Sequence, residues 1–257
     1  MIRAAFFDID GTLVSFRTHC ISKGTVQAFV KLHENGIHTF IATGRPSCLI
    51  PAMPVAFDGY ITMNGGYCFM GDKIVYKNPI PAEESLLWLK YVKDNDICTL
   101  VFTDHEMFVN TLCNPIANAL SEEIKFSMPP LLPLEEMSRK EAYQFIAIMD
   151  SDRDNEVLSF LPNCRLPRWH PKFADLIHAN NSKAVGIESI ISHLGINRQE
   201  CICFGDGAND IEMLEYCGIG VAMGNAEDKV KNHADFITTS VDEEGISHAL
   251  YKLGIIR

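Results

Sequence analysis

Hydrophobic residues fall into short runs that alternate with longer amphipathic stretches at the start of the chain. Residues 3–7 and 37–42 are compact apolar runs, which is typical of buried parallel strands. Between them, Ser22 can cap a helix that continues through Glu34, and Asn35-Gly36 supplies its stop. The pattern therefore predicts a strand, a helix and a second strand in the first part of the chain.

The same alternation returns near the end of the chain, after a third early strand and a hairpin. It predicts strands over residues 60–63, 67–70, 73–77, 201–204, 219–223 and 236–238, and helices over residues 183–194, 209–216, 226–232 and 243–252. Such alternation is typical of a parallel sheet that helices cover on both faces, with ligand chemistry at the carboxyl ends of the strands. We therefore predict an α/β fold whose core is a Rossmann-like, doubly wound parallel sheet.

The middle of the chain has a different order of elements. It predicts helices over residues 83–92, 115–123 and 153–161, a hairpin of 99–102 with 107–111, and strands over 143–149, 165–169 and 173–179. Helices in this order can cover only one face of a mainly antiparallel sheet. We therefore expect residues 81–180 to form an α+β domain inserted into a discontinuous core of residues 1–80 and 181–257.

Composition and charge limit the classes of molecule that the protein can bind. The 257 residues are 47% hydrophobic and carry a formal net charge of −11, which disfavours nucleic acid and anionic membrane surfaces as partners. No uninterrupted apolar stretch reaches the roughly 20 residues that a membrane-spanning helix needs. The nine cysteines form no CxxC pair, and the chain opens on a strand-like segment rather than a signal peptide. We expect a cytoplasmic protein with reduced thiols.

Two carboxylates follow the first predicted strand. Asp8 and Asp10 are two positions apart on an extended chain and share a face, and Gly11 permits the turn that follows. One carboxylate can attack phosphorus while the other protonates the leaving oxygen and later activates water. An ordinary Asp-Gly turn is the simpler alternative. A calcium loop would need flanking helices and a later acidic ligand, and Leu13-Val14-Ser15 supplies neither.

A second acidic cluster follows a later strand. Asp206, Asn209 and Asp210 lie in the run GDGAND, between the strand at 201–204 and the next helix. Carboxylate oxygens brought beside Asp8 would suit Mg²⁺, which favours hard oxygen ligands and can bridge a protein to a phosphate. A flexible, capped loop would explain this cluster if it stood alone, but its repetition after a second strand favours a shared metal site.

Two further motifs offer groups that bind anions. Thr43-Gly44 follows the strand at 37–42, where a hydroxyl and free backbone N–H groups can bind phosphoryl oxygens, although Thr43 could also be a simple helix cap. Lys183 follows Ser182 at the start of a helix, where a cation is poorly placed unless an anion is near. Its place between the middle segment and the returning alternation lets Lys183 reach the same edge of the sheet.

The four motifs in this order resemble the haloacid dehalogenase superfamily of aspartyl-phosphate phosphatases. The inserted middle segment resembles the large α/β cap of the Cof-type sugar-phosphatase subfamily. The resemblance implies that Asp8 is the nucleophile and a Mg²⁺ ligand, and that Asp10 is the acid/base with its backbone carbonyl on the metal. It implies further roles for five residues: metal ligation by Asp206, phosphoryl binding by Thr43, Lys183 and Asn209, and support of Lys183 or a metal-bound water by Asp210.

The expected substrate is a small phosphorylated metabolite such as a hexose or pentose phosphate, and the sequence does not reveal whether the protein has a protein partner. Two alternatives stay open: a phosphosugar mutase, and a regulator that binds Mg²⁺ and a phosphometabolite with little turnover. Polar and aromatic residues near the returning end of the cap are candidate substrate contacts, but core packing or a solvated edge explains them equally well. They are Arg168, Trp169, His170 and Asp175.

Overall fold

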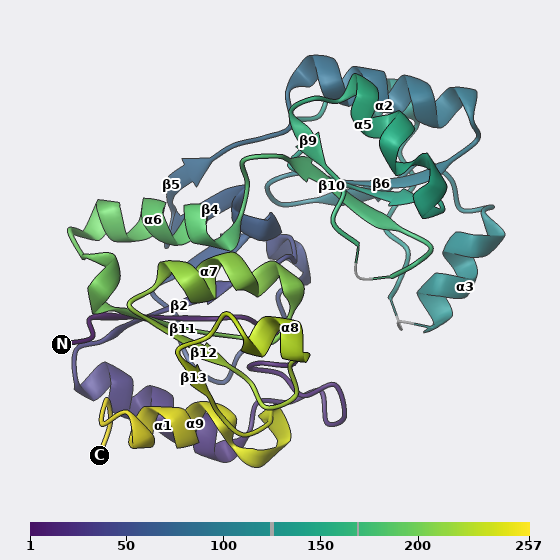
Figure 1. Cartoon of the computed structure of the whole chain (residues 1–257). Coiled ribbons are helices and arrows are strands. Elements are labelled where there is room, and N and C mark those ends of the chain that lie inside the picture. Colours follow the sequence, from purple (N-terminus) through teal and green to yellow (C-terminus); the bar gives the residue numbers. More distant parts are fainter. Residues whose placement is uncertain (124–125, 169) are drawn as a thin grey trace. The chain divides into compact units, whose positions relative to one another are not determined.

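The computed structural model describes residues 1–123, 126–168 and 170–257 (Figure 1). The chain divides into two compact units. Unit 1 comprises residues 1–45, 51–77 and 182–257, and unit 2 comprises residues 46–50 and 78–181. The second unit is thus inserted in sequence into the first, and it also takes in the short segment Pro46–Ile50.

Unit 1 is built on an eight-stranded sheet with the order β13-β12-β11-β1-β2-β3-β4-β5. The six strands from β13 to β3 pair in parallel, and β4 and β5 add an antiparallel hairpin at one edge. The strands are β1 (Ala4–Phe7), β2 (His38–Ala42), β3 (Gly59–Thr62), β4 (Tyr67–Met70), β5 (Lys73–Lys77), β11 (Cys201–Gly205), β12 (Ile219–Ala222) and β13 (Phe236–Ile237).

Helices cover both faces of this sheet, as Figure 1 shows. They are α1 (Lys23–Glu34), α6 (Lys183–Leu194), α7 (Ile211–Tyr216), α8 (Asp228–Lys231) and α9 (Gly245–Lys252). Apolar side chains of α6, α7 and α8 share one buried cluster with Phe6 and Phe40 of the sheet. On the other face, Phe29 of α1 packs against Phe7, and α9 lies beside α1. The predicted α/β core with a doubly wound sheet is confirmed.

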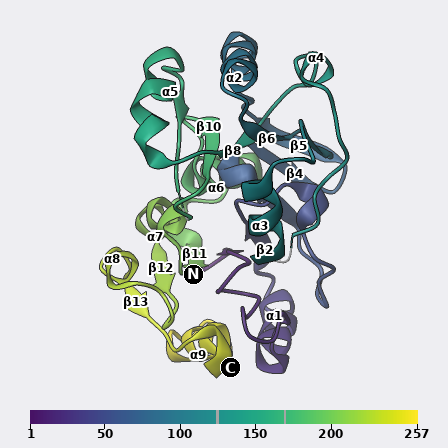
Figure 2. The ribbon, with the colours of Figure 1, turned by 90° about the vertical axis from the view of Figure 1, so that its right-hand side faces the viewer.

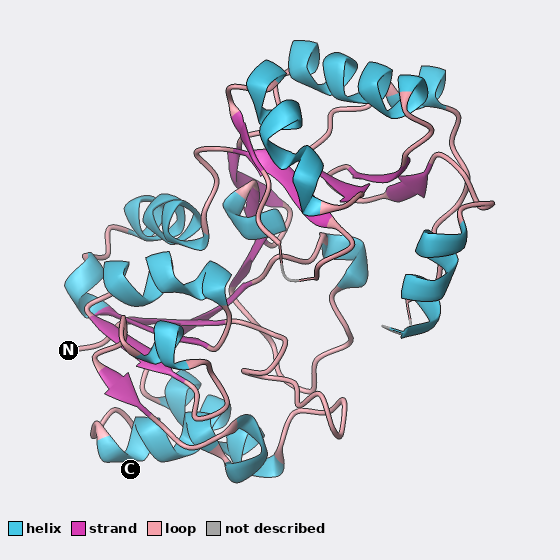
Figure 3. Ribbon diagram, turned by 45° about the vertical axis from the view of Figure 1, so that its right-hand side comes forward, coloured by secondary structure: helices cyan, strands magenta, loops and turns pink. Residues whose placement is uncertain are grey.

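Unit 2 has a five-stranded sheet with the order β7-β6-β8-β10-β9, in which every pairing is antiparallel. Helices α2 and α5 lie along one face of it (Figures 2 and 3), where Trp88 and Val157 join Phe145 in a buried cluster. The elements are α2 (Ala82–Asp94), β6 (Cys98–Phe102), β7 (Met107–Val109), α3 (Pro115–Glu123), α4 (Leu134–Met137), β8 (Gln144–Ile148), α5 (Asp154–Phe160), β9 (Cys164–Arg165) and β10 (Ala174–His178). This unit is the α+β insertion that the sequence indicates.

The strand predicted over residues 165–169 is present but shorter, since β9 spans Cys164–Arg165 and residues 166–168 lie outside it. Strand β9 ends at Arg165, because Pro167 has no N–H to donate to a ladder. Trp169 lies outside the described residues. Helix α4 was not predicted, since four residues give too little periodicity to recognise.

The long segment of unit 2 is joined to unit 1 at two places in the chain. The insertion begins at Asn78 and ends at Asn181, against the predicted 81 and 180. Asn78 and Asn181 bond to each other through their side chains, since Asn78 Nδ2 donates to Asn181 Oδ1 at 2.8 Å and Asn181 Nδ2 donates to Asn78 O at 3.0 Å. The two connecting segments are therefore held together where they enter and leave unit 2.

Candidate active site

Asp8 lies at the carboxyl end of the central strand β1. All four residues of β1 are buried, and the strand ends at Phe7. Asp8 is therefore the first residue after the strand, and it is buried too. Lys183 Nζ lies 2.6 Å from Asp8 Oδ1 and 2.6 Å from Asp210 Oδ1. Lys183 is fully buried and is the first residue of α6. The Ser182 side chain caps this helix, because it accepts a hydrogen bond from Val185 N. One buried cation thus bridges two carboxylates from different strands.

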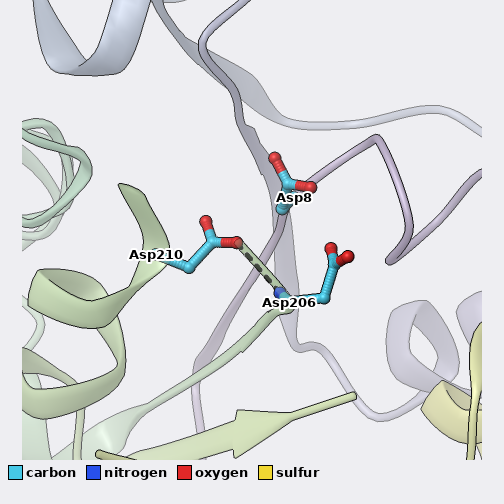
Figure 4. A group of neighbouring side chains, drawn as sticks. All are labelled: Asp8, Asp206 and Asp210. Carbon is cyan, nitrogen blue, oxygen red and sulfur yellow. Dashed lines mark hydrogen bonds between the residues drawn. The ribbon is translucent and has the colours of Figure 1, made fainter. Parts of the chain in front are cut away.

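Asp210 is held on every side by the protein. Its Oδ2 accepts from the backbone N–H of Asp206 at 2.9 Å (Figure 4). The same oxygen accepts from Gly207 N at 2.8 Å, and Oδ1 accepts from Lys183. These bonds fix the loop after β11 and leave Asp210 to orient Lys183. Asp210 therefore supports the site rather than offering a free ligand atom.

Asp206 lies beside the loop that follows Asp8. Thr12 Oγ1 donates to Asp206 Oδ1 at 2.9 Å, and Asn225 Nδ2 donates to Asp206 Oδ2 at 3.1 Å and to Gly11 O at 2.9 Å. Gly11 has φ +84°, and a Cβ at this position would lie 2.1 Å from Asp206 Oδ2. Only glycine permits this approach, so Gly11 sets both the turn and the spacing between the two acidic motifs.

Asp10 is placed differently from the other three aspartates. Its carboxylate pairs with Arg45, whose Nε and Nη2 lie 2.7 Å from Asp10 Oδ2 and Oδ1 respectively. The Asp10 carboxylate is partly exposed. No backbone N–H in the described ranges donates to the Asp10 carbonyl oxygen, which leaves that oxygen available to a ligand.

Thr43, Gly44 and Asn209 lie around the turn that follows β3. Thr43 is buried, and its Oγ1 accepts from Arg45 N at 3.1 Å. Asn209 Nδ2 donates to Asn64 Oδ1 at 3.0 Å, and a Cβ on Gly44 would lie 3.2 Å from the Asn64 amide. The loops after β2, β3 and β11 thus meet at one edge of the sheet.

Burial and neighbouring charges raise the pKa values of three groups in this cluster, for different reasons. Burial raises the pKa of Asp8 well above its usual range, against the lowering effect of Lys183. Burial, and then the charge of Asp210, raise the pKa of Asp206 to about 6. Burial alone would lower the pKa of Lys183, but the charges of Asp210 and Asp8 outweigh it and raise this pKa. The site holds more negative charge than Lys183 neutralises, so it favours a bound cation.

The residues present fit a divalent metal such as Mg²⁺. Ligand atoms of Asp8, Asp206 and Asp210 lie within 4.8 Å of one another, and no other such cluster occurs in the described part of the chain. Asp210 Oδ2 already accepts two backbone N–H groups, whereas each oxygen of Asp206 accepts only one hydrogen bond and keeps a lone pair, so the carboxylates of Asp8 and Asp206 are the groups that would hold a metal. Hard carboxylate oxygens of this kind suit Mg²⁺.

Replacing Thr12 with valine is expected to weaken Mg²⁺ binding by about 10- to 100-fold, because Asp206 loses the hydroxyl that orients it. Titration calorimetry of the purified protein with Mg²⁺ measures this change. The exposed Thr18→Val is the matched control and should bind Mg²⁺ as the wild type does. Unchanged affinity in Thr12→Val would show that Asp206 is not a ligand or needs no orientation.

Comparison with known proteins identifies the family. Residues 5–250 match the model of the haloacid dehalogenase-like hydrolases. The putative phosphatase YxeH of Bacillus subtilis is 40% identical, with 98% of each chain covered, and the putative phosphatase YkrA of the same species is 32% identical, again with 98% of each covered. A solved structure described as the HAD subclass IIB sugar phosphatase BT4131 has a TM-score of 0.89 at 40% identity, covering 99% of this chain and 100% of its own. BT1666 from Bacteroides thetaiotaomicron, described among the phosphatases of this superfamily, has a TM-score of 0.91 at 37% identity, covering 100% of this chain and 96% of its own.

The chain is a phosphatase with an α/β fold. The sheet, the matches and the buried lysine between two carboxylates agree on this class. It belongs to the haloacid dehalogenase superfamily and to its Cof-type members. The family predicted from the four sequence motifs is therefore confirmed. In the described ranges, no helix combines the length and the apolar character needed to span a membrane.

Three contacts of the site were not predicted from the sequence. Asn64, Asn225 and the Asp10 partner Arg45 were not singled out, although each follows a parallel strand at its carboxyl end. That position was a usable signal, because the carboxyl ends of parallel strands share one edge of the sheet. Arg168, a candidate substrate contact, instead pairs with Asp154 inside unit 2, at 2.8 Å and 2.5 Å.

Proposed function

We propose that the protein is a Mg²⁺-dependent hydrolase of small phosphomonoesters that forms an aspartyl-phosphate on Asp8, with Asp10 as general acid and base. The observation that carries this proposal is the contact of Asp8 with the fully buried Lys183. A lysine held at 2.6 Å keeps one oxygen of Asp8 fixed, so the other oxygen has a defined direction for attack.

Asp8 and Asp10 have distinct parts in the proposed reaction. One oxygen of Asp8 forms a bond to phosphorus as the bond from phosphorus to the leaving oxygen breaks, and Asp10 gives that oxygen a proton. Asp10 then takes a proton from the water that attacks the same phosphorus and frees Asp8. A bound Mg²⁺ would supply positive charge that neutralises and orients a phosphoryl oxygen.

Arg45 and Lys183 have different roles in the proposed reaction. Lys183 and Thr43 bind the phosphoryl oxygens, and the positive charge of Lys183 offsets the negative charge of these oxygens during transfer. Arg45 holds both oxygens of Asp10, so Asp10 must exchange one of these bonds before it can meet the leaving oxygen. The pair therefore positions the acid at the edge of the site until a substrate arrives.

The proposed substrates are sugar phosphates of hexose or pentose size. The similarity to a sugar phosphatase over the full chain supports this choice, and so does the net charge of −11, which disfavours polyanionic substrates. We also propose that residues 81–180 act as the cap domain that selects the leaving group. A cytoplasmic location is part of the same proposal.

A phosphate-release assay tests the proposed function. A generic aryl phosphate and a panel of sugar phosphates are incubated with the protein, with Mg²⁺ and with chelator. We expect release with Mg²⁺ only, and free phosphate rather than an isomerised sugar phosphate as the product. An isomerised product would favour a phosphosugar mutase, and tight binding of a phosphometabolite without release would favour a regulator.

Mg²⁺ binding is expected to weaken as the pH falls. The pKa of Asp206 is raised from 3.8 to about 6 in the metal-free fold, so its proton stabilises that fold below about pH 4, and this contribution is lost as the pH rises through 6. Because Mg²⁺ must displace this proton, its affinity should be at least about tenfold lower near pH 5 than near pH 7.5. Calorimetric titrations at the two pH values measure the ratio. Equal affinities would contradict the assignment of Asp206 as a ligand.

A further inference from the structure

The turn after β3 touches three of the segments that form the site. Asn64 N donates to Thr43 O at 3.0 Å, and Asn64 Oδ1 accepts from Asn209 Nδ2 at 3.0 Å. A Cβ on the next residue, Gly65, would lie 2.0 Å from the carbonyl oxygen of Ser182, the residue before Lys183. One short turn thus packs against the segments that carry Thr43, Asn209 and Lys183.

The backbone of this turn is held in an uncommon conformation. Met63, Asn64 and Gly65 all have positive φ, at 49°, 52° and 91°. Two consecutive non-glycine residues in the left-handed region are costly, and such residues persist where the surrounding structure imposes them, often at functional sites. Met63 is completely buried, so its packing holds the turn while Asn64 is presented to the loops around it.

Asn64 keeps hydrogen-bond donors that the protein does not use. Its side chain is 4% exposed, its oxygen is taken by Asn209, and no acceptor for its Nδ2 occurs among the described residues. The Gly44 N–H likewise has no acceptor in the ranges that the structure describes. The two groups are close, since a Cβ built on Gly44 would lie 3.2 Å from Asn64 Nδ2.

Thr43 adds a third donor beside these two. Its Oγ1 accepts from Arg45 N, which leaves the hydroxyl proton to be donated. Asn64 Nδ2 and the half-buried Gly44 can be reached from solvent, and three donors side by side suit a ligand rich in acceptor oxygens. A phosphoryl group has such oxygens, and neutral donors can hold it without adding to the charge of the site.

We propose that Asn64 is a phosphoryl-binding residue: Asn209 fixes its carboxamide through the oxygen, and its Nδ2 donates to a phosphoryl oxygen beside Gly44 N–H. The inference rests on the proposed function, because it takes the group bound at Thr43 and Gly44 to be the transferring phosphoryl. It gives Asn209 a positioning role, as the residue that orients the Asn64 amide.

Two substitutions separate this role from that of holding the turn. Asn64→Asp keeps an acceptor for Asn209 and a side chain that tolerates positive φ, but it loses both N–H donors and adds a negative charge. Asn64→Gly keeps the backbone conformation and loses the whole carboxamide. Asn232→Asp, at an exposed position at the end of α8, adds the same charge to unit 1 outside the site.

The experiment measures competitive inhibition by inorganic phosphate in the presence of Mg²⁺, together with kcat/KM for an aryl phosphate and the melting temperature. We expect Asn64→Asp and Asn64→Gly to raise the Ki of phosphate by about tenfold or more and to lower kcat/KM by about 10²-fold. Asn232→Asp should match the wild type. Asn64→Gly avoids backbone strain, so its Ki for phosphate tests the inference even if Asn64→Asp does not fold.

The result that overturns the inference is a Ki of phosphate within about threefold of the wild type in either folded Asn64 variant. Such a variant with a lower melting temperature would show that Asn64 only holds the turn. Failure of the proposed function has a different signature: the wild type itself would release no phosphate with Mg²⁺ and would not bind inorganic phosphate, which removes the ground for the inference too.

Discussion

Replacing Asp8 with asparagine is expected to lower kcat by at least about 10⁴-fold, because the amide cannot form the bond to phosphorus. The isosteric side chain keeps the shape of the site, and Lys183 keeps its contact with Asp210. Steady-state phosphate release in the presence of Mg²⁺ measures the loss. The exposed Asp72→Asn, in the turn between β4 and β5, is the matched control and should retain wild-type activity.

The same substitution should leave the metal-free fold at least as stable as the wild type. Burial raises the pKa of Asp8 in the folded state, so its protonated form stabilises the fold at low pH and this contribution is lost as the pH rises through that raised value. The buried negative charge of Asp8 is therefore a cost to the metal-free fold, and a neutral amide removes that charge. A large fall in the urea midpoint of Asp8→Asn would contradict this account of the site.

Replacing Lys183 with methionine is expected to destabilise the protein by about 3–5 kcal/mol and to lower kcat by about 10²–10³-fold. The charges of Asp210 and Asp8 overcome burial and raise the pKa of Lys183 in the folded state. Its stabilising contribution is thus complete below the unfolded pKa, near 10.5, and is lost only as the pH rises through the folded value. At neutral pH, methionine leaves two buried carboxylates without their cation.

Urea denaturation at neutral pH measures the stability of Lys183→Met, and phosphate release measures its activity. Lys229→Met is the matched control, since Lys229 is exposed and pairs with Glu227 at the surface, at 3.0 Å. Adding Asp210→Asn to Lys183→Met should recover part of the lost stability by removing one of the two charges. A Lys183→Met protein with wild-type stability would show that the buried pair contributes nothing to the fold.

The strands that carry the site could be predicted because each is a short apolar run that ends in a polar motif. Asp8, Thr43 and Asp206 follow β1, β2 and β11 at their carboxyl ends, which is where a parallel sheet gathers ligand residues. The helix that begins at Lys183 was also predicted with its observed bounds, since Ser182 and Gly195 mark its ends.

Other features depend on contacts between segments that are far apart in the sequence. The proposed role of Asn64 follows from a left-handed turn and from a bond to Asn209, 145 positions away. The bond between Asn225 and Asp206 and the pair of Asp10 with Arg45 likewise form only in the folded chain. Local patterns of hydrophobicity contain no information about such pairings.

Trapping the phosphorylated enzyme tests the central claim most directly. A sugar phosphate with labelled phosphorus is mixed with the protein and Mg²⁺, the reaction is quenched with acid within one turnover, and the labelled peptide is identified. The account predicts a label on the peptide at Asp8 that needs Mg²⁺ and is absent from Asp8→Asn. A label on a different residue, or phosphate release by Asp8→Asn at the wild-type rate, would contradict it.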